Sequence, residues 1–241
     1  MRSAEDDLSV KEADVDEKWH RLIPSRFPPV EVYETFGDSE IVEIAKALEA
    51  KTNPRLKEKA WQLEGRSVRE NSPALQNWNH APFAYPNPEG STFLDPAYSV
   101  LEMVRGVRPA LARALRRREQ FLQRTSEPPL GVDMRLLITP VKGRFVDLSE
   151  AAIDPNQANR WAMGKGFYDE GKNGILFRSP EQPASLSLSI FNNTVLGRSV
   201  QATHYRFVWD GNIVSKIYDF ADGSELTRSE VLSEGPGLAA A

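Results

Sequence analysis

The stretch Ser-Leu-Ser-Leu-Ser-Ile at residues 185–190 decides the fold class of this 241-residue chain. Apolar and polar side chains alternate along it, and this period of two predicts a half-buried strand. The run 132–139 alternates in the same way. The runs 204–209 and 213–218, joined at Asp210-Gly211, predict a hairpin, because Asp-Gly is a favoured hairpin turn. The second half of the chain therefore predicts a mainly antiparallel sheet.

Helical periodicity appears on either side of these strands. A first helix is predicted over 39–51, with Asp38 or Ser39 as its cap and Pro54 ending it. A second is predicted over 108–124, with Pro109 in its first turn, and a short third helix over 157–170. Residues 66–95 are rich in Pro, Asn, Ser and Gly and predict mostly loop. The sum is a single α+β domain with helices packed on the sheet.

The helix predicted over 108–124 has two different faces. Its apolar side chains recur at helical spacing and are expected to be buried: Leu111, Ala114, Leu115, Phe121 and Leu122. Three arginines, Arg113, Arg117 and Arg124, lie together on the opposite side.

Bulk composition places the chain among ordinary globular proteins. It is 40% hydrophobic and 27% charged, with a net charge of −4 and no cysteine. The absence of cysteine excludes disulfides and thiolate metal sites and fits a reducing cytoplasm. No signal peptide or membrane-spanning run is present in the sequence, so we expect a cytoplasmic protein that does not enter a membrane. We expect an acidic mobile tail over 1–18, one domain over 19–221 and a C-terminal tail over 222–241.

Common catalytic and metal-binding motifs are missing. The three histidines have no metal-ligand spacing, and Gly164–Gly166 lacks the pattern of a phosphate-binding loop. The basic run 113–118 has two interpretations: it holds the phosphates of a nucleotide or RNA, or it is a solvated helix face partly neutralised by Glu119. No aromatic residues interleave with these arginines, which disfavours nucleic acid.

Several segments, in order across roughly residues 19–220, resemble the longer type of RES-domain protein, the NAD-degrading toxins of bacterial toxin–antitoxin pairs. The matching segments are 20–29, 48–56, 81–83, 87–91, 118–122, 127–129 leading into 133–135, 174–179 and 207–211. No single segment is specific, but their order is.

This resemblance implies a fold related to the ADP-ribosyltransferases and a cleft in which the bond between NAD and nicotinamide is broken. Such chemistry passes through an oxocarbenium-like state. It calls for an arginine on the phosphates or ribose, an aromatic residue at the nicotinamide end and a carboxylate near the developing positive charge. No metal is implied. In RES proteins these roles fall to an arginine, a tyrosine and a glutamate, with a serine further on.

The family positions carry different residues in this chain. The expected arginine is Thr92, the strand that should carry tyrosines has Leu101-Glu102, and the expected glutamate is Arg113. Only the serine, at Ser179, is retained. A threonine makes no bidentate charged contact, and a guanidinium opposes developing positive charge. The family's NAD cleavage is therefore expected to be lost or altered.

Three hypotheses stay open at this point. In the first, Glu102 and Arg113 form an ion pair across a vacated cleft that still binds a nucleotide or an antitoxin protein. In the second, an active enzyme uses a relocated Glu102 and Ser179 as catalytic groups, with Thr92, Arg113 and Arg117 around a bound NAD. In the third, the basic helix docks an acidic partner or RNA and the protein is no enzyme. A homo-oligomer is compatible with all three.

Overall fold

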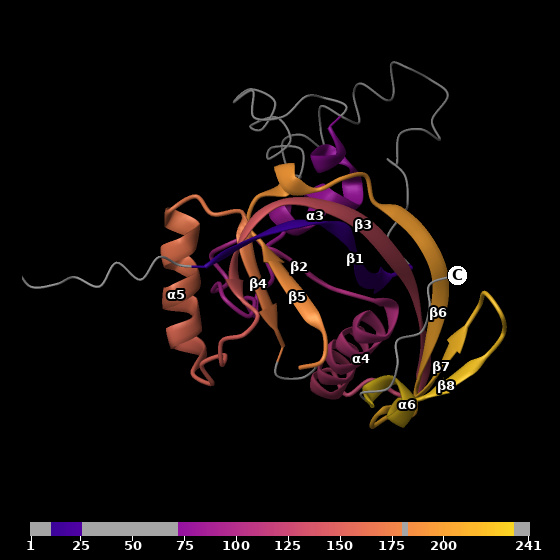
Figure 1. The fold of residues 1–241 in the computed structure, drawn as a ribbon. Coiled ribbons are helices and arrows are strands. Elements are labelled where there is room, and N and C mark those ends of the chain that lie inside the picture. The colour runs from indigo at the N-terminus through magenta and orange to yellow at the C-terminus, as the bar shows by residue number, and fades with distance from the viewer. Residues whose placement is uncertain (1–10, 26–71, 180–182, 234–241) are drawn as a thin grey trace, which may run out of the picture.

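The computed structural model describes residues 11–25, 72–179 and 183–233, which form one curved sheet with helices on it (Figure 1). The strands follow the order β1-β2-β5-β4-β3-β6-β7-β8, and every pairing among them is antiparallel except β3 with β4. Their bounds are β1 Glu12–Pro24, β2 Leu101–Val104, β3 Leu130–Leu148, β4 Gly174–Arg178, β5 Leu186–Ile190, β6 Val200–Trp209, β7 Val214–Asp219 and β8 Glu225–Thr227. The predicted α+β class with a mainly antiparallel sheet is confirmed.

Five of these strands close into a ring. Strand β1 pairs with β3 along its whole length and also meets β2 at His20 and Val104. The ring β1-β2-β5-β4-β3 encloses its own apolar cluster, in which Trp19, Met103 and Leu188 are fully buried. Side chains on β2 alternate, so Leu101 and Met103 point into the ring and Glu102 points out of it.

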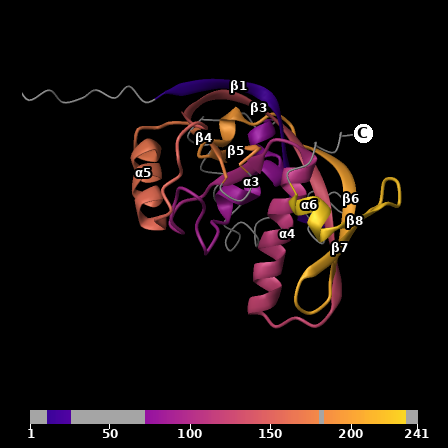
Figure 2. The same ribbon diagram turned by 60° about the horizontal axis from the view of Figure 1, so that its bottom comes forward.

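The described helices and turns are η2 Pro73–Leu75, α3 Asn77–Ala84, α4 Val107–Arg124, α5 Gln157–Asp169, η3 Asn193–Val195 and α6 Arg228–Leu232. Helix α4 lies along the concave side of the sheet with α6 beside it, and α5 stands at the far end next to β4 (Figures 1 and 2). The helices predicted over 108–124 and 157–170 are confirmed. The helix predicted over 39–51 lies outside the described residues.

Helix α4 is held by a second apolar cluster. Leu111, Leu115 and Leu122 pack with Phe207 and Trp209 of β6, as their periodicity predicts. Phe121, expected to be buried, is 48% exposed and lies under the guanidinium of Arg118. None of the described helices has the length and apolar character needed to cross a bilayer.

The predicted N-terminal tail is corrected for residues 12–18, which belong to β1. The strand pattern there is concealed by charge, because Val15 is the only buried residue among 12–18. Acidic side chains on the outer face pair across the strands with bases of β3, as Asp16 does with Lys142. Such cross-strand pairs favour this register although the segment is acidic.

The predicted C-terminal tail is corrected in the same way for 225–232, which form β8 and α6. Thr227 caps α6 in a reciprocal capping box with Glu230. Arg228 of α6 pairs with Glu119 of α4, whose side chain is 9% exposed and also accepts the Val214 backbone N–H. Glu119 therefore anchors α6 and does not neutralise the neighbouring arginines of α4.

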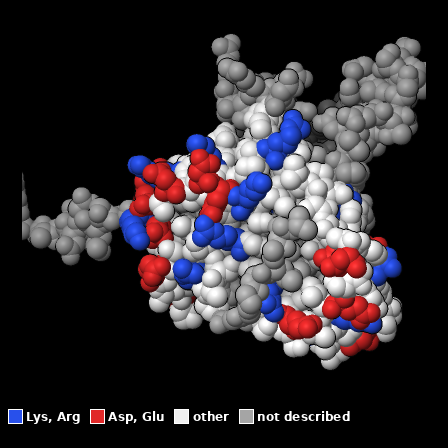
Figure 3. Space-filling model, turned by 45° about the vertical axis from the view of Figure 1, so that its right-hand side comes forward, with Lys and Arg blue, Asp and Glu red and all other residues white. Residues whose placement is uncertain are grey.

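Two further expectations change in detail. Within the predicted loop 66–95, helix α3 is fixed by buried Asn79, whose amide donates to the Pro73 and Gly197 carbonyls and accepts from Ser199. Strand β5 is buried on both faces, since Ser187 and Ser189 are inaccessible as well as its apolar residues. Its apolar side chains belong to the cluster inside the ring, and the two serines lie on the opposite face. On the surface, acidic and basic side chains intermingle, with basic ones in a line across the middle of one face (Figure 3).

Candidate functional site

A cleft of about 690 Å³ opens between α4 and the outer face of β2. Strand β1 contributes Arg21, the loop 87–92 forms one wall, and α4 contributes a row of basic side chains. Thr92, Glu102, Arg113, Arg117 and Ser179 all line this cleft. The structure thus brings together every site residue that the sequence predicted, although they come from four separate segments of the chain.

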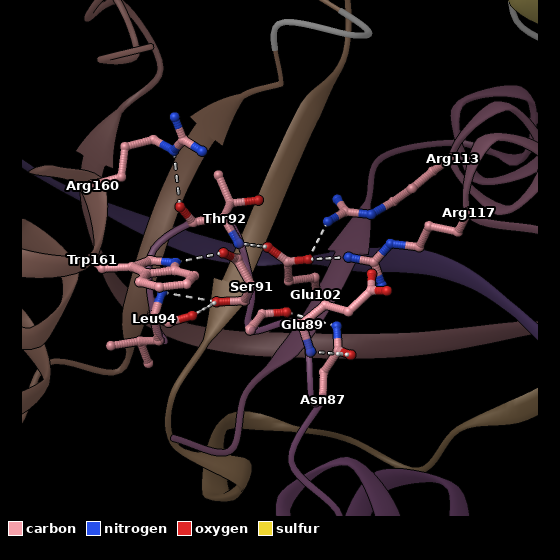
Figure 4. Close-up of polar contacts among 11 residues, drawn as sticks. Asn87, Glu89, Ser91, Thr92, Leu94, Glu102, Arg113, Arg117, Arg160 and Trp161 are labelled. Carbon is pink, nitrogen blue, oxygen red and sulfur yellow. Dashed lines mark hydrogen bonds and ion pairs between the residues drawn. The ribbon is translucent and has the colours of Figure 1, made fainter. Parts of the chain in front are cut away.

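Glu102 is the centre of the polar contacts in this cleft (Figure 4). Its carboxylate accepts the Thr92 backbone N–H at 3.0 Å on one oxygen. The other oxygen accepts from Arg113 and, at 2.6 Å, from Arg117. The expected ion pair between Glu102 and Arg113 is therefore present, and Arg117, one helical turn further along α4, joins it. Both guanidiniums reach a single carboxylate oxygen.

The Glu102 side chain is only 4% exposed, against 17% for Arg113 and 51% for Arg117. Burial acts to raise the pKa of this carboxyl, but Arg113, Arg117 and the Thr92 N–H outweigh it and lower the pKa to about 2. The group is thus an anion held by two cations and an amide, and neutral pH does not protonate it.

Acid should remove the stabilisation that this cluster supplies. The folded pKa of Glu102 is about 2 against an ordinary 4.5, so the ionised group stabilises the fold above about pH 4.5 and loses this effect as pH falls toward 2. We expect the difference in unfolding free energy between the wild type and Glu102→Gln to shrink by more than half from pH 6 to pH 3. Urea unfolding of both proteins at several pH values measures this difference in unfolding free energy. A difference that does not change with pH would contradict the assigned charge state of Glu102.

The wall formed by residues 87–94 is fixed from behind by α5. Trp161 Nε1 donates to the Ser91 carbonyl at 3.0 Å, and Arg160 Nε donates to the Thr92 carbonyl at 3.1 Å. Phe93 is buried against Phe177 of β4, with ring centroids 4.9 Å apart. Because Thr92 lies between these anchors, its N–H is held toward Glu102. Thr92 thus contributes its backbone N–H to the site.

Sequence reasoning missed Arg21 as a site residue. It lies two residues after the buried Trp19 on β1, at a position where strand alternation predicts an apolar side chain. Arg21 instead lines the cleft and donates to the Trp78 carbonyl. The signal that could have found it is an arginine at an inward position of a strand, since unpaired charged residues are rarely buried.

A catalytic serine and a metal site have less support in the structure than the Glu102 cluster. Ser179 directly follows β4 and lines the cleft, and its catalytic role stays a prediction. Among residues 11–25, 72–179 and 183–233, no group of three or more His, Cys, Asp or Glu side chains could hold a metal ion. What the cleft offers chemically is a set of guanidinium donors around one compensated carboxylate.

Comparison with known proteins places these segments in a family. Residues 68–210 match the RES domain. The protein y4oC of Sinorhizobium fredii (strain NBRC 101917 / NGR234) is 44% identical over 225 residues, which are 92% of this chain and 95% of that relative. A chain of the crystal structure of the M. tuberculosis MbcT–MbcA toxin–antitoxin complex is similar at 9% identity and a TM-score of 0.43, covering 79% of this chain and 86% of that chain. The RES match includes the loop 87–92, β2, α4 and Ser179.

Proposed function

The chain belongs to the RES domain family, and we propose that it binds a nucleotide of the NAD type in the cleft without cleaving NAD as expected of that family. An antitoxin protein as its partner stays a prediction drawn from the family resemblance.

One observation carries the proposal: the Glu102 carboxylate is already compensated by Arg113 and Arg117. Cleavage of a glycosidic bond to nicotinamide develops positive charge on the ribose, and a carboxylate promotes it only where its negative charge is directed at that carbon. A guanidinium about 4 Å from the developing charge would add about 4 kcal/mol to the barrier at an effective dielectric constant near 20. That corresponds to about a thousandfold in rate.

Binding is supported by the size and composition of the cleft. Its volume of about 690 Å³ lies within the range of small-molecule and cofactor pockets. The arginines of α4 offer forked donors of the kind that bind phosphate groups. The fixed loop 87–92 gives the pocket a rigid wall, which reduces the conformational entropy that the protein loses when a ligand binds.

We expect purified protein to bind NAD without releasing nicotinamide. Calorimetry measures binding, and chromatography of the same mixture after prolonged incubation measures free nicotinamide. Ser179→Ala and Glu102→Gln serve as controls for turnover, since a contaminating hydrolase would be equally active in all three preparations. Turnover by the wild type that both variants lack would overturn the proposal.

That contrary result would establish the second candidate, an active enzyme with a relocated carboxylate. It is favoured by the position of Glu102 and Ser179 on one cleft and by the low pKa that keeps Glu102 ionised. Neither binding nor turnover would instead point to the third hypothesis, an interaction module whose basic helix α4 docks an acidic partner.

A further inference from the structure

Arg21 is a cation in an unusual setting. Its Nη2 donates to the Trp78 carbonyl, while its Nε is buried and has no hydrogen-bond partner among the described residues. Burial lowers the pKa of the guanidinium to about 10. Even this value leaves Arg21 fully charged at neutral pH. A charged group removed from water is costly unless an opposite charge and hydrogen bonds compensate it.

No carboxylate of the described residues supplies that compensation. The two acidic side chains lining the cleft are already engaged, Glu102 with Arg113 and Arg117, and Glu89 with Arg124. Among the described residues, half-buried Arg21 at the cleft wall therefore has a peptide carbonyl as its hydrogen-bond acceptor and no carboxylate that neutralises its charge.

The other charged side chains that line the cleft are also mainly positive. Five arginines line it against two glutamates, an excess of three positive charges in a chain whose net charge is −4. They are Arg21 from β1 and Arg113, Arg116, Arg117 and Arg118 from α4. The Nε of Arg116 is buried and, among the described residues, likewise lacks a partner. The excess positive charge thus comes from two elements.

We propose that Arg21 anchors the diphosphate group of a nucleoside diphosphate or dinucleotide bound in this cleft, with Arg116 of α4 as a second donor. The role of Arg21 rests on the proposed function, in which the cleft binds a nucleotide. Arg21 and the diphosphate are then the residue and the ligand group that decide the affinity for the nucleotide. Phosphate oxygens match the planar fork of arginine and accept charge-assisted hydrogen bonds. A diphosphate has enough oxygens to accept from donors on two elements at once.

The test compares ligands that differ only in phosphate. ADP, AMP and adenosine are titrated calorimetrically into the wild type, Arg21→Met and Arg21→Lys. We expect the wild type to bind ADP at least tenfold more tightly than adenosine and Arg21→Met to lose this preference. A tenfold loss equals about 1.4 kcal/mol. Arg21→Lys should keep part of the preference, because it retains the charge and loses the fork.

Arg144→Met is the matched control. Arg144 is an exposed arginine on β3 that pairs with Glu12 and Asp14 away from the cleft, so this variant should bind ADP as the wild type does. Thermal unfolding without ligand separates a binding role from a structural one. Removing an uncompensated cation should leave the Tm of Arg21→Met unchanged or higher. A lower Tm with an unchanged preference for ADP would mean that Arg21 only supports Trp78, and would overturn the inference.

The two proposals fail in different ways. If the wild type binds ADP and NAD but Arg21→Met and Arg21→Lys bind ADP equally well, the role of Arg21 is wrong and nucleotide binding stands. If no nucleotide binds, both are wrong. If NAD is hydrolysed while Arg21→Met loses the preference for ADP, the absence of cleavage is wrong and the anchor is correct. Should Arg21→Met not fold, Arg21→Lys still decides the question.

Discussion

Replacing Glu102 by glutamine is expected to lower the free energy of unfolding by about 3–5 kcal/mol at neutral pH, the usual effect of removing one partner of a buried ion pair. Glutamine keeps the shape and can still accept the Thr92 N–H, so the change isolates the charge. Arg113, whose side chain is only 17% exposed, would lose its carboxylate. Arg117 is half exposed and can turn to water, so most of the loss falls on Arg113.

Glu89→Gln is the matched control for this variant. Glu89 lines the same cleft and also pairs with an arginine of α4, Arg124, but both side chains are more than half exposed. Exposed ion pairs contribute about 0–1 kcal/mol, so this variant should unfold close to the wild type. Urea unfolding followed by tryptophan fluorescence measures both. Equal stabilities for the two variants would show that the buried ion pair of Glu102 stabilises the fold no more than the exposed ion pair of Glu89. The description of Glu102 as a charge-compensated buried carboxylate would then be wrong.

The compensated carboxylate could be predicted from the sequence to a useful extent. The family resemblance placed Glu102 and Arg113 at positions that face each other, and helical spacing put Arg117 on the same side of α4 as Arg113. Neither argument indicates that one oxygen accepts from both guanidiniums. That detail depends on how closely α4 packs on β2, which long-range contacts determine.

Long-range pairing also explains what the sequence did not reveal in β1. Its partner β3 is more than a hundred residues away, and the alternating pattern of 12–18 is masked by charges that are balanced only across the ring. The same holds for Glu119, whose partner Arg228 lies in a segment expected to be a tail. Local periodicity predicted α4, β5, β6, β7 and part of β3, because their own apolar residues supply the signal, and it missed α3, β4, β8 and α6.

Gly164→Ala is expected to destabilise the protein by about 2–3 kcal/mol, as overpacked sites do. Gly164 is the buried glycine of α5, and a Cβ there would lie 1.9 Å from the Phe93 carbonyl oxygen and 2.7 Å from its carbon. Backbone atoms cannot turn aside as a side chain can. Either α5 or the segment around Phe93 must therefore move.

Gly166→Ala on the same helix is the control, because its Cβ would meet nothing within 4 Å. Alanine is favoured over glycine inside a helix by about 0.5–1 kcal/mol, so this variant should be more stable than the wild type. Thermal and urea unfolding should thus show changes in stability of opposite sign for the same Gly→Ala substitution at two positions two residues apart. Stabilisation by both would mean that α5 does not pack backbone to backbone on Phe93.

The effect of Gly164→Ala should extend to the cleft. Phe93 directly follows Thr92, and Trp161 and Arg160 of α5 hold the carbonyls of Ser91 and Thr92. Moving α5 withdraws these donors, and the Thr92 N–H then loses its fixed direction toward Glu102. We therefore expect Gly164→Ala to weaken nucleotide binding while Gly166→Ala leaves it unchanged. A helix outside the cleft would then affect ligand affinity through the backbone of one loop, because that loop connects α5 with Glu102 by hydrogen bonds.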